Sequence, residues 1–208
     1  MKTSIQGKIC PASSVGIHLG RRPALVGVLM AVCWFTLWAG SASARPDAYK
    51  EYEIKAVFLL NFTQFVEWPE GTFTETNTTL NIGVLGDEAF ADTLQQTVNG
   101  ERVKGRLLTI KRFSRGAVVK DCHVLFVSRS EESHLKELHD LLAGMGVLTV
   151  GECQDFSTCG GVINFFPQGS KIRFEINPDE ARRKGLKISA QLLSLGKIVD
   201  SGSPKERH

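Results

Sequence analysis

The chain has 208 residues, 42% of them hydrophobic, and a formal net charge of +3. Residues 1–44 hold four basic residues and no acidic one, so the part that follows has a net charge near −1. This charge argues against a general electrostatic attraction to nucleic acids or anionic membranes. The 164 residues that follow suit one domain with a hydrophobic core of its own.

The N-terminal segment has the order of features of a secretory signal peptide. Arg21-Arg22 is followed by an apolar run at 24–40 and then by small residues up to Ala44. We predict that residues 1–44 are removed by cleavage between Ala44 and Arg45, which delivers the product to an oxidising compartment. The alternative is an uncleaved membrane anchor, but an apolar core of about 17 residues lies at the bottom of the spanning range.

The first half of the domain alternates between helical and extended patterns. Residues 48–68 carry apolar side chains at spacings of three and four, which predicts a helix that Pro69 ends. Residues 80–86 predict a buried strand. The stretch from Glu88 to Gly100 predicts a helix that Asp87 caps and Gly100 closes.

The alternation continues through the middle of the chain. Strands are predicted at 106–113, 122–128 and 147–151, and a helix at 131–146. Strands separated by helices imply right-handed crossovers and parallel pairing. The fold class is therefore α/β, with a Rossmann-like, largely parallel sheet flanked by helices.

The C-terminal part departs from this rhythm. "GVINFF" and "KIRFEIN" are separated by four turn residues, which predicts an antiparallel hairpin. Pro178 then opens a predicted final helix that runs to Val199. We expect its apolar stripe to face the core; the stripe consists of Leu186, Ile188, Leu192, Leu195 and Val199. Residues 45–202 form one predicted domain, and 203–208 a disordered tail.

The residue patterns of common catalytic sites are absent from the sequence. It contains no Gly-rich phosphate loop, no H-E-x-x-H and no G-x-S-x-G. His134 and His139 lie five residues apart and do not converge on a metal as an i, i+4 pair would, so we interpret them as part of a solvated face. The charged stretch at 179–184 has the same interpretation. We predict no enzymatic activity, no metal and no cofactor.

One pattern in the sequence favours a protein that binds a small ligand. Gly86 and Asp87 follow a strand and open a helix, which is the position where Rossmann-like folds bind anions. A periplasmic small-ligand-binding protein or enzyme is therefore the alternative function. A single glycine followed by an acid is a weak signal, because Asp87 would repel phosphate, and we interpret the pair as a capped turn.

Two cysteines, Cys153 and Cys159, lie six positions apart before the hairpin. A redox motif would be C-x-x-C, and metal ligation would need further thiols or imidazoles close by. The preferred interpretation is a disulfide, which would contribute about 2 kcal/mol; the alternative is that all thiols stay free. Cys122 begins a predicted buried strand and is interpreted as an inert packed thiol.

Two blocks of sequence resemble the YfiR family of periplasmic proteins. They are "EYEIKAVFLLNFTQFVEWP" and "CGGVINFFPQGSKIRFEINPDEARRKGLKISAQLLSLGKIV", and "GVLGD" matches between them. The resemblance implies an α/β homodimer that binds the periplasmic domain of an inner-membrane diguanylate cyclase and represses it. An outer-membrane lipoprotein with a peptidoglycan-binding domain would sequester the repressor, which raises cyclic di-GMP and promotes biofilm formation.

The resemblance also bears on the cysteines. The family has a C-terminal disulfide that Cys153 and Cys159 match. It can have a second disulfide whose later half matches Cys122, but the earlier half should lie near Gly83, where this chain has no cysteine. Cys122 is therefore left unpaired, and the central sheet lacks the crosslink that this second disulfide would supply.

The partner-binding surface is predicted around the cysteine loop and the hairpin. Phe156 is flanked by polar residues, so it is either an exposed aromatic anchor of the kind that dominates interfaces or a lid that folds into the core. Thr158 lies in the same loop. Arg173 and Ile176 on the second hairpin strand extend the surface, although Ile176 fits the core equally well.

Overall fold

A computed structural model describes residues 46–74 and 78–200 of the chain. The predicted signal peptide, its cleavage site at Ala44 and Arg45, and the predicted tail at 203–208 lie outside the described residues. Within those residues, no helix combines the length and the apolar character needed to cross a membrane.

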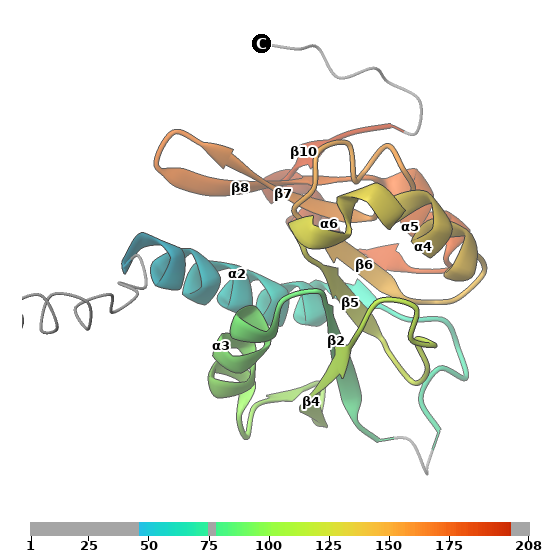
Figure 1. Cartoon of the computed structure of the whole chain (residues 1–208). Helices are drawn as coiled ribbons and strands as arrows, with labels where there is room; N and C mark the ends of the chain where they lie inside the picture. The colour runs from blue at the N-terminus through green and yellow to red at the C-terminus, as the bar shows by residue number, and fades with distance from the viewer. Residues whose placement is uncertain (1–45, 75–77, 201–208) are drawn as a thin grey trace, which may run out of the picture. The chain divides into compact units, whose positions relative to one another are not determined.

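Five parallel strands form the centre of an eight-stranded sheet (Figure 1). In chain order they are β2 (Leu80–Leu85), β4 (Arg106–Phe113), β5 (Val124–Val127), β6 (Leu148–Gly151) and β7 (Ile163–Gln168). Their order across the sheet is β4-β2-β5-β6-β7, and each neighbouring pair is parallel. This is the order of a doubly wound α/β sheet, so the predicted fold class is confirmed.

Antiparallel strands extend the sheet at both ends. β3 (Arg102–Val103) pairs with β4 at one end. At the other end β8 (Lys171–Ile176) pairs antiparallel with β7, which confirms the predicted hairpin, and β10 (Lys197–Ile198) lies parallel to β8.

Helices cover both faces of the sheet, and alternate strand residues belong to separate hydrophobic clusters. Val124 and Phe126 of β5 face the cluster that includes α2 (Pro46–Phe65) and α3 (Glu88–Val98). Leu125 and Val127 face the second cluster, with Leu135 and Leu142. The predicted helix at 131–146 is shorter in the structure and begins with a 3₁₀ turn; it consists of η1 (Arg129–His134) and α4 (Leu135–Leu141).

The first helix ends three residues before the predicted boundary. Val66 and Glu67 form strand β1 (Val66–Glu67), which pairs antiparallel with β9 (Lys187–Ile188). The aromatic face of α2 packs on the hairpin, where the Phe62 ring lies 5.0 Å from that of Phe174. This contact fixes the hairpin against the first helix.

A single final helix was predicted from Pro178 to Val199, and this prediction is wrong. The segment forms α5 (Pro178–Arg183), β9, α6 (Ala190–Leu195) and β10. Gly185 at φ +72° follows the end of α5, and the Ser189 side chain caps α6. Leu192 is buried as expected, but Leu195 is 63% exposed, because the helix does not continue through the stripe.

Candidate functional site

The topological switch point lies between β2 and β5, where the crossovers leave for opposite faces of the sheet. Ligands of open α/β sheets bind at the carboxyl ends of such strands. Here those ends are close together, because the Ser128 N–H donates to the Leu85 carbonyl at 3.1 Å. The chain therefore has the geometry in which a ligand crevice would form.

Serine side chains fill this crevice. The Ser130 hydroxyl donates to the Gly86 carbonyl at 3.1 Å and lies 2.8 Å from the Ser128 hydroxyl. A Cβ placed on Gly86 would lie 2.4 Å from Ser130 Oγ and 2.6 Å from Ser128 Oγ. The backbone of the β2 turn and these hydroxyls are thus in direct contact, with no space between them for an anion.

The charge at the switch point also disfavours an anion. Glu131 is buried there and accepts a hydrogen bond of 3.0 Å from Arg115 Nε. This hydrogen bond lowers the pKa of the Glu131 carboxyl, against the opposing effect of burial. The Arg115 guanidinium is therefore paired with this carboxylate.

Asp87 caps helix α3, which confirms the capped-turn interpretation. Its Oδ1 accepts a hydrogen bond from the Phe90 N–H at 2.8 Å, and its Oδ2 accepts one from the Tyr52 hydroxyl at 2.7 Å. Burial and the Asp87 carboxylate together raise the pKa of Tyr52. The feature that favoured a phosphate ligand is therefore a structural cap.

A cavity of about 320 Å³ lies beside the switch point, between the 114–119 segment and α4. Leu85, Val119, Leu138 and Leu141 contribute apolar walls. The charged groups at its rim include Arg115 and Glu131, which bond to each other. The cavity is a largely apolar groove, and its lining also includes His134 and Glu137.

The cysteine loop at 152–161 lies at the carboxyl end of β6. Cys153 is buried and its thiol donates to the Ser128 carbonyl at 3.4 Å, whereas Cys159 is exposed. The three cysteines of the described residues are free thiols, so the structure contains no Cys153–Cys159 bond. The disulfide stays a prediction for the oxidised protein.

Phe156 is the lid of this loop and not an exposed anchor. It is 4% exposed, and a Cβ on Gly151 or Gly161 would lie 2.5 or 2.2 Å from its ring. Ile176 is 0% exposed and belongs to the core. Neither side chain reaches the surface in this conformation, so the core alternative holds for both, and their contact with a partner stays a prediction.

The other two predicted contact residues, Thr158 and Arg173, are at least partly accessible to a partner. Thr158 is half-buried, and its hydroxyl donates to the Asp155 carbonyl at 2.8 Å. Arg173 is exposed on β8. In this conformation the accessible part of the predicted surface is Thr158 and Arg173, and its role in partner binding stays a prediction.

Hydrogen bonds hold the loop without a disulfide. The Asn177 amide donates to the Ser157 carbonyl at 2.8 Å, and its Oδ1 accepts from the Glu180 N–H at 3.0 Å as the N-cap of α5. The Ser157 hydroxyl donates to Glu175 Oε1 at 3.1 Å. These bonds tie the loop to both β8 and α5.

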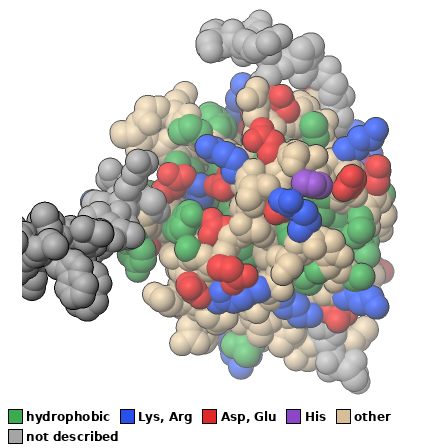
Figure 2. Space-filling view, viewed as in Figure 1, with side chains coloured by type: hydrophobic (Ala, Val, Ile, Leu, Met, Phe, Trp, Pro, Cys, Tyr) green, Lys and Arg blue, Asp and Glu red, His purple; other side chains and the backbone are tan. Residues whose placement is uncertain are grey.

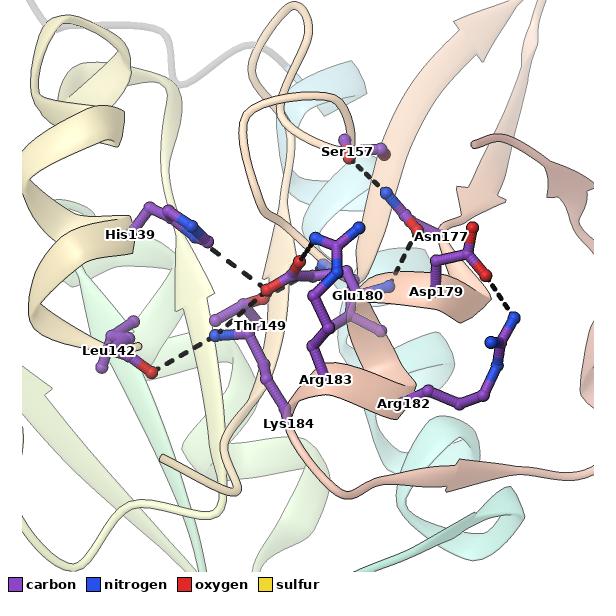
Figure 3. A network of polar contacts seen from close by, with 11 residues as sticks. His139, Leu142, Thr149, Ser157, Asn177, Asp179, Glu180, Arg182, Arg183 and Lys184 are labelled. Carbon is purple, nitrogen blue, oxygen red and sulfur yellow. Dashed lines mark hydrogen bonds and ion pairs between the residues drawn. The ribbon is translucent and has the colours of Figure 1, made fainter. Parts of the chain in front are cut away.

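A buried ion cluster lies behind the loop (Figure 3). Glu180 is buried, with Arg183 NH1 at 2.5 Å and Lys184 Nζ at 3.6 Å. Lys184 is also buried and donates to the Leu142 carbonyl at 3.3 Å, which joins α5 to the end of α4. Burial lowers the pKa of Lys184, and the Glu180 carboxylate opposes part of this shift.

The charged stretch at 179–184 was interpreted as a solvated face, and this interpretation is wrong for the centre of the stretch. It holds for the exposed Arg182, which pairs with Asp179, but not for Glu180 and Lys184. His139 also faces this cluster, with its Nδ1 at 4.0 Å from Glu180 Oε1. A capping-box pattern places a carboxylate three residues after Asn177, and this signal could have located Glu180.

The position of Cys122 fits the second disulfide that the resemblance implies for related chains. A Cβ on Gly83 would lie 2.8 Å from Cys122 Sγ, so the position that lacks a cysteine touches the one that has it. Burial raises the pKa of Cys122 to about 12, which keeps the thiol protonated and unreactive. Among the described residues, no group of His, Cys, Asp and Glu side chains could hold a metal ion.

These features define a class of protein: a doubly wound α/β domain whose ligand crevice is filled by its own side chains and whose parallel sheet is extended by a hairpin. A family model described as YfiR/HmsC-like matches residues 52–197. The chain belongs to the YfiR/HmsC-like family.

One solved structure with a detectable likeness is a glycine decarboxylase, the P-protein of the glycine cleavage system, in an inhibitor-bound form. It shares 13% identity with this chain, over 84% of this chain and 47% of that one, with a TM-score of 0.32. The chain thus spans about half the length of that protein. The likeness carries no argument about function.

Proposed function

We propose that this protein is a periplasmic regulator that binds the periplasmic domain of an inner-membrane diguanylate cyclase and represses it. Membership of the YfiR/HmsC-like family across residues 52–197 carries the proposal. The filled switch point supports it, because a small-ligand enzyme on this fold would need that crevice open. Repression would lower cyclic di-GMP and biofilm formation.

The proposal includes export. The mature chain would begin at Arg45 and fractionate with the periplasm, where the proposed partner domain lies. N-terminal sequencing of the purified protein checks this prediction. A membrane-bound product that still begins at Met1 would contradict it.

The partner surface is proposed to include Thr158 and Arg173, on the cysteine loop and on β8. The face in Figure 2 shows charged side chains of both signs with small groups of apolar ones between them. A contact that forms and dissociates is about as apolar as the rest of a protein surface, so a mixed face of this kind is compatible with one. An outer-membrane peptidoglycan-binding lipoprotein is the proposed sequestering partner, and the repressor itself is proposed to be a homodimer.

The test measures cyclic di-GMP in cells that carry each variant at matched protein abundance. Deletion of the gene should raise cyclic di-GMP, and the parent gene should restore the low level. Cys159→Ser should release the cyclase, through loss of the predicted disulfide and of loop order. The matched control is Cys122→Ser, which changes a buried thiol outside the loop.

The same assay includes Asp87→Ala, which should leave cyclic di-GMP unchanged because Asp87 serves as a helix cap. An unaffected Cys159→Ser strain beside a derepressed Asp87→Ala strain would move the functional site to the strand ends. That result would favour the alternative function, a small-ligand binder. Co-purification with the cyclase domain, with and without a reducing agent, measures the contact directly.

A further inference from the structure

The β7–β8 hairpin extends past the strands on either side of it (Figure 1). β6 pairs with β7 only at Ile163 and Asn164, and β10 pairs with β8 only at Glu175 and Ile176. Within residues 46–74 and 78–200, no other strand pairs with the outer edge at 165–168 or at 171–174. The hairpin is therefore a two-stranded arm with two open edges.

The two edges differ in their ability to accept another strand. Pro167 lies on the β7 edge and has no N–H to donate, which is a common protection of exposed edges. The β8 edge contains no proline. The Ile176 carbonyl faces outward, since it accepts from the Val199 N–H at 2.9 Å. Because backbone groups alternate along a strand, those of Ile172 and Phe174 face outward as well. The parallel pairing of Lys197 with Glu175 uses the Phe174 carbonyl, so the open groups are those of Ile172 and the Phe174 N–H.

The two faces of the β8 edge have different chemistry. Phe174 packs against the aromatic residues of α2, and Ile172 shares its face with the same cluster. Lys171 and Arg173 are exposed and point to the opposite face, because side chains alternate along a strand. In the described part of the chain, neither of these cations forms an ion pair.

β10 continues both faces of the edge. Ile198 lies beside Ile176 and Lys197 beside Glu175, so the apolar residue and the cation fall on the matching faces. Ile198 and Lys197 are both exposed. Glu175 shares the face of Lys171 and Arg173, but it is buried and accepts a hydrogen bond from Ser157. The edge thus presents one apolar row and one row whose exposed charges are basic to any strand added along it.

A second copy of this chain does not fit the edge. Antiparallel pairing of two β8 edges about a two-fold axis keeps each face continuous, so residues opposite each other come from the same row. Lys171 and Arg173 would then face the same cations of the other copy. Like charges directly opposite each other destabilise a strand pair.

We propose that the β8 edge binds an extended segment of a partner protein, as an added strand in which acidic and apolar residues alternate. The apolar side chains cover Ile172, and the acidic ones meet Lys171 and Arg173. Backbone bonds to Ile172 and to the Phe174 N–H hold the segment. The inference rests on the proposed function in one respect: the periplasmic domain of the cyclase is the partner that would supply this segment.

The first experiment uses synthetic peptides and the mature protein. The probe is a capped hexapeptide of alternating glutamate and valine, and its binding is measured by fluorescence anisotropy at low salt. A lysine–valine peptide and a glutamate–valine peptide with N-methylated amides are the controls. The glutamate–valine peptide should bind at least about tenfold more tightly than either, given two opposite-charge pairs and the backbone bonds.

Charge reversal provides the decisive variant. Lys171→Glu with Arg173→Glu should exchange the preference, so that the lysine–valine peptide binds more tightly. Both residues are exposed, so the fold should survive. The matched control reverses two exposed lysines on other elements, Lys120→Glu with Lys136→Glu, and should keep the parent's preference. A parent that binds all peptides equally, or a variant without the exchange, overturns the inference.

A second variant tests the backbone bonds and separates the two proposals. Ile172→Pro removes an outward N–H and should abolish peptide binding and capture of the purified cyclase domain, with circular dichroism to check folding. If capture and repression persist in Ile172→Pro and in the charge-reversed variant, the edge inference fails and the proposed function stands. If the parent binds the peptide with the expected preference but captures no cyclase domain, the proposed function fails and the edge stands as a strand-binding site.

Discussion

Two regions of the molecule each contain a buried glutamate. The two regions differ because only one of these glutamates has a buried cation as a partner. At the switch point, Glu131 pairs with Arg115, whose side chain is 56% exposed. Behind the cysteine loop, Glu180 pairs with Arg183, which is 57% exposed, and also meets Lys184, which is buried like Glu180 itself. An exposed partner can turn to water when its carboxylate is removed, whereas a buried one stays as an uncompensated charge. The second cluster therefore depends on its pairing more strongly than the first.

The largest expected effect comes from Glu180→Gln. It leaves the Lys184 ammonium buried without a counter-charge, so the free energy of unfolding should fall by about 3–5 kcal/mol. Urea denaturation measures the loss. Glu131→Gln is the matched control and should cost about 1–2 kcal/mol, because Arg115 can move into water. Equal losses in the two variants would contradict the comparison, and Lys184→Met added to Glu180→Gln should restore most of the stability.

The second effect concerns how tightly the switch point is filled. Gly86 has φ +86°, and an added Cβ would meet Ser130 Oγ at 2.4 Å. Gly86→Ala should therefore cost about 2–4 kcal/mol, from backbone strain and from the clash. Gly144 has φ +74° and open space around it, so Gly144→Ala carries the strain alone. Thermal melting of both variants isolates the clash, and equal melting temperatures would show that the crevice has room.

A smaller effect is expected at the cap beside the same crevice. Asp87→Ala removes the bond to the Phe90 N–H and the acceptor of the Tyr52 hydroxyl. The expected loss is about 1 kcal/mol, the usual value for an N-cap. Asp87→Asn keeps the capping oxygen and should restore most of the stability in the same denaturation assay. A loss of several kcal/mol in Asp87→Asn would give the negative charge a role beyond capping.

The smallest effect is a pH dependence from Lys184. Burial holds its pKa below the ordinary value of 10.5, so between the two values the unfolded chain binds more protons than the folded one. The contribution of Lys184 to the free energy of unfolding therefore rises with pH across this window, and its cost is fully present below the folded pKa. Lys184→Met should remove that rise. Urea titrations of both proteins from pH 7 to about 10.5 measure it, and identical slopes would contradict the buried charge.

The sequence predicted the central sheet well, for local reasons. The strands at 80–86, 106–113 and 147–151 lie within a residue or two of β2, β4 and β6, because runs of apolar residues bounded by turns are local signals. The Asp87 cap and the hairpin were predicted on the same basis. Each of these elements can be predicted from a few neighbouring residues.

The final helix shows where local patterns fail. Apolar residues from Leu186 to Val199 are spaced closely enough for a helix, but Lys187 and Ile188 pair with Val66 and Glu67. A strand partner more than a hundred residues away outweighed the local helical preference of this segment. The apolar stripe was therefore divided between the core and the surface.

The sequence by itself determined the succession of the five parallel strands, the cap, the hairpin turn and the family, since each depends on residues close together in the chain. Tertiary structure decided that Glu180 and Lys184 are buried, that Phe156 closes the loop, and that the β8 edge stays open. Burial depends on which distant elements cover a side chain, and an open edge depends on where a neighbouring strand stops. Charged and polar residues have the same local pattern on a solvated face as in a buried ion cluster, so only the packing of α4, α5 and the cysteine loop distinguishes the two.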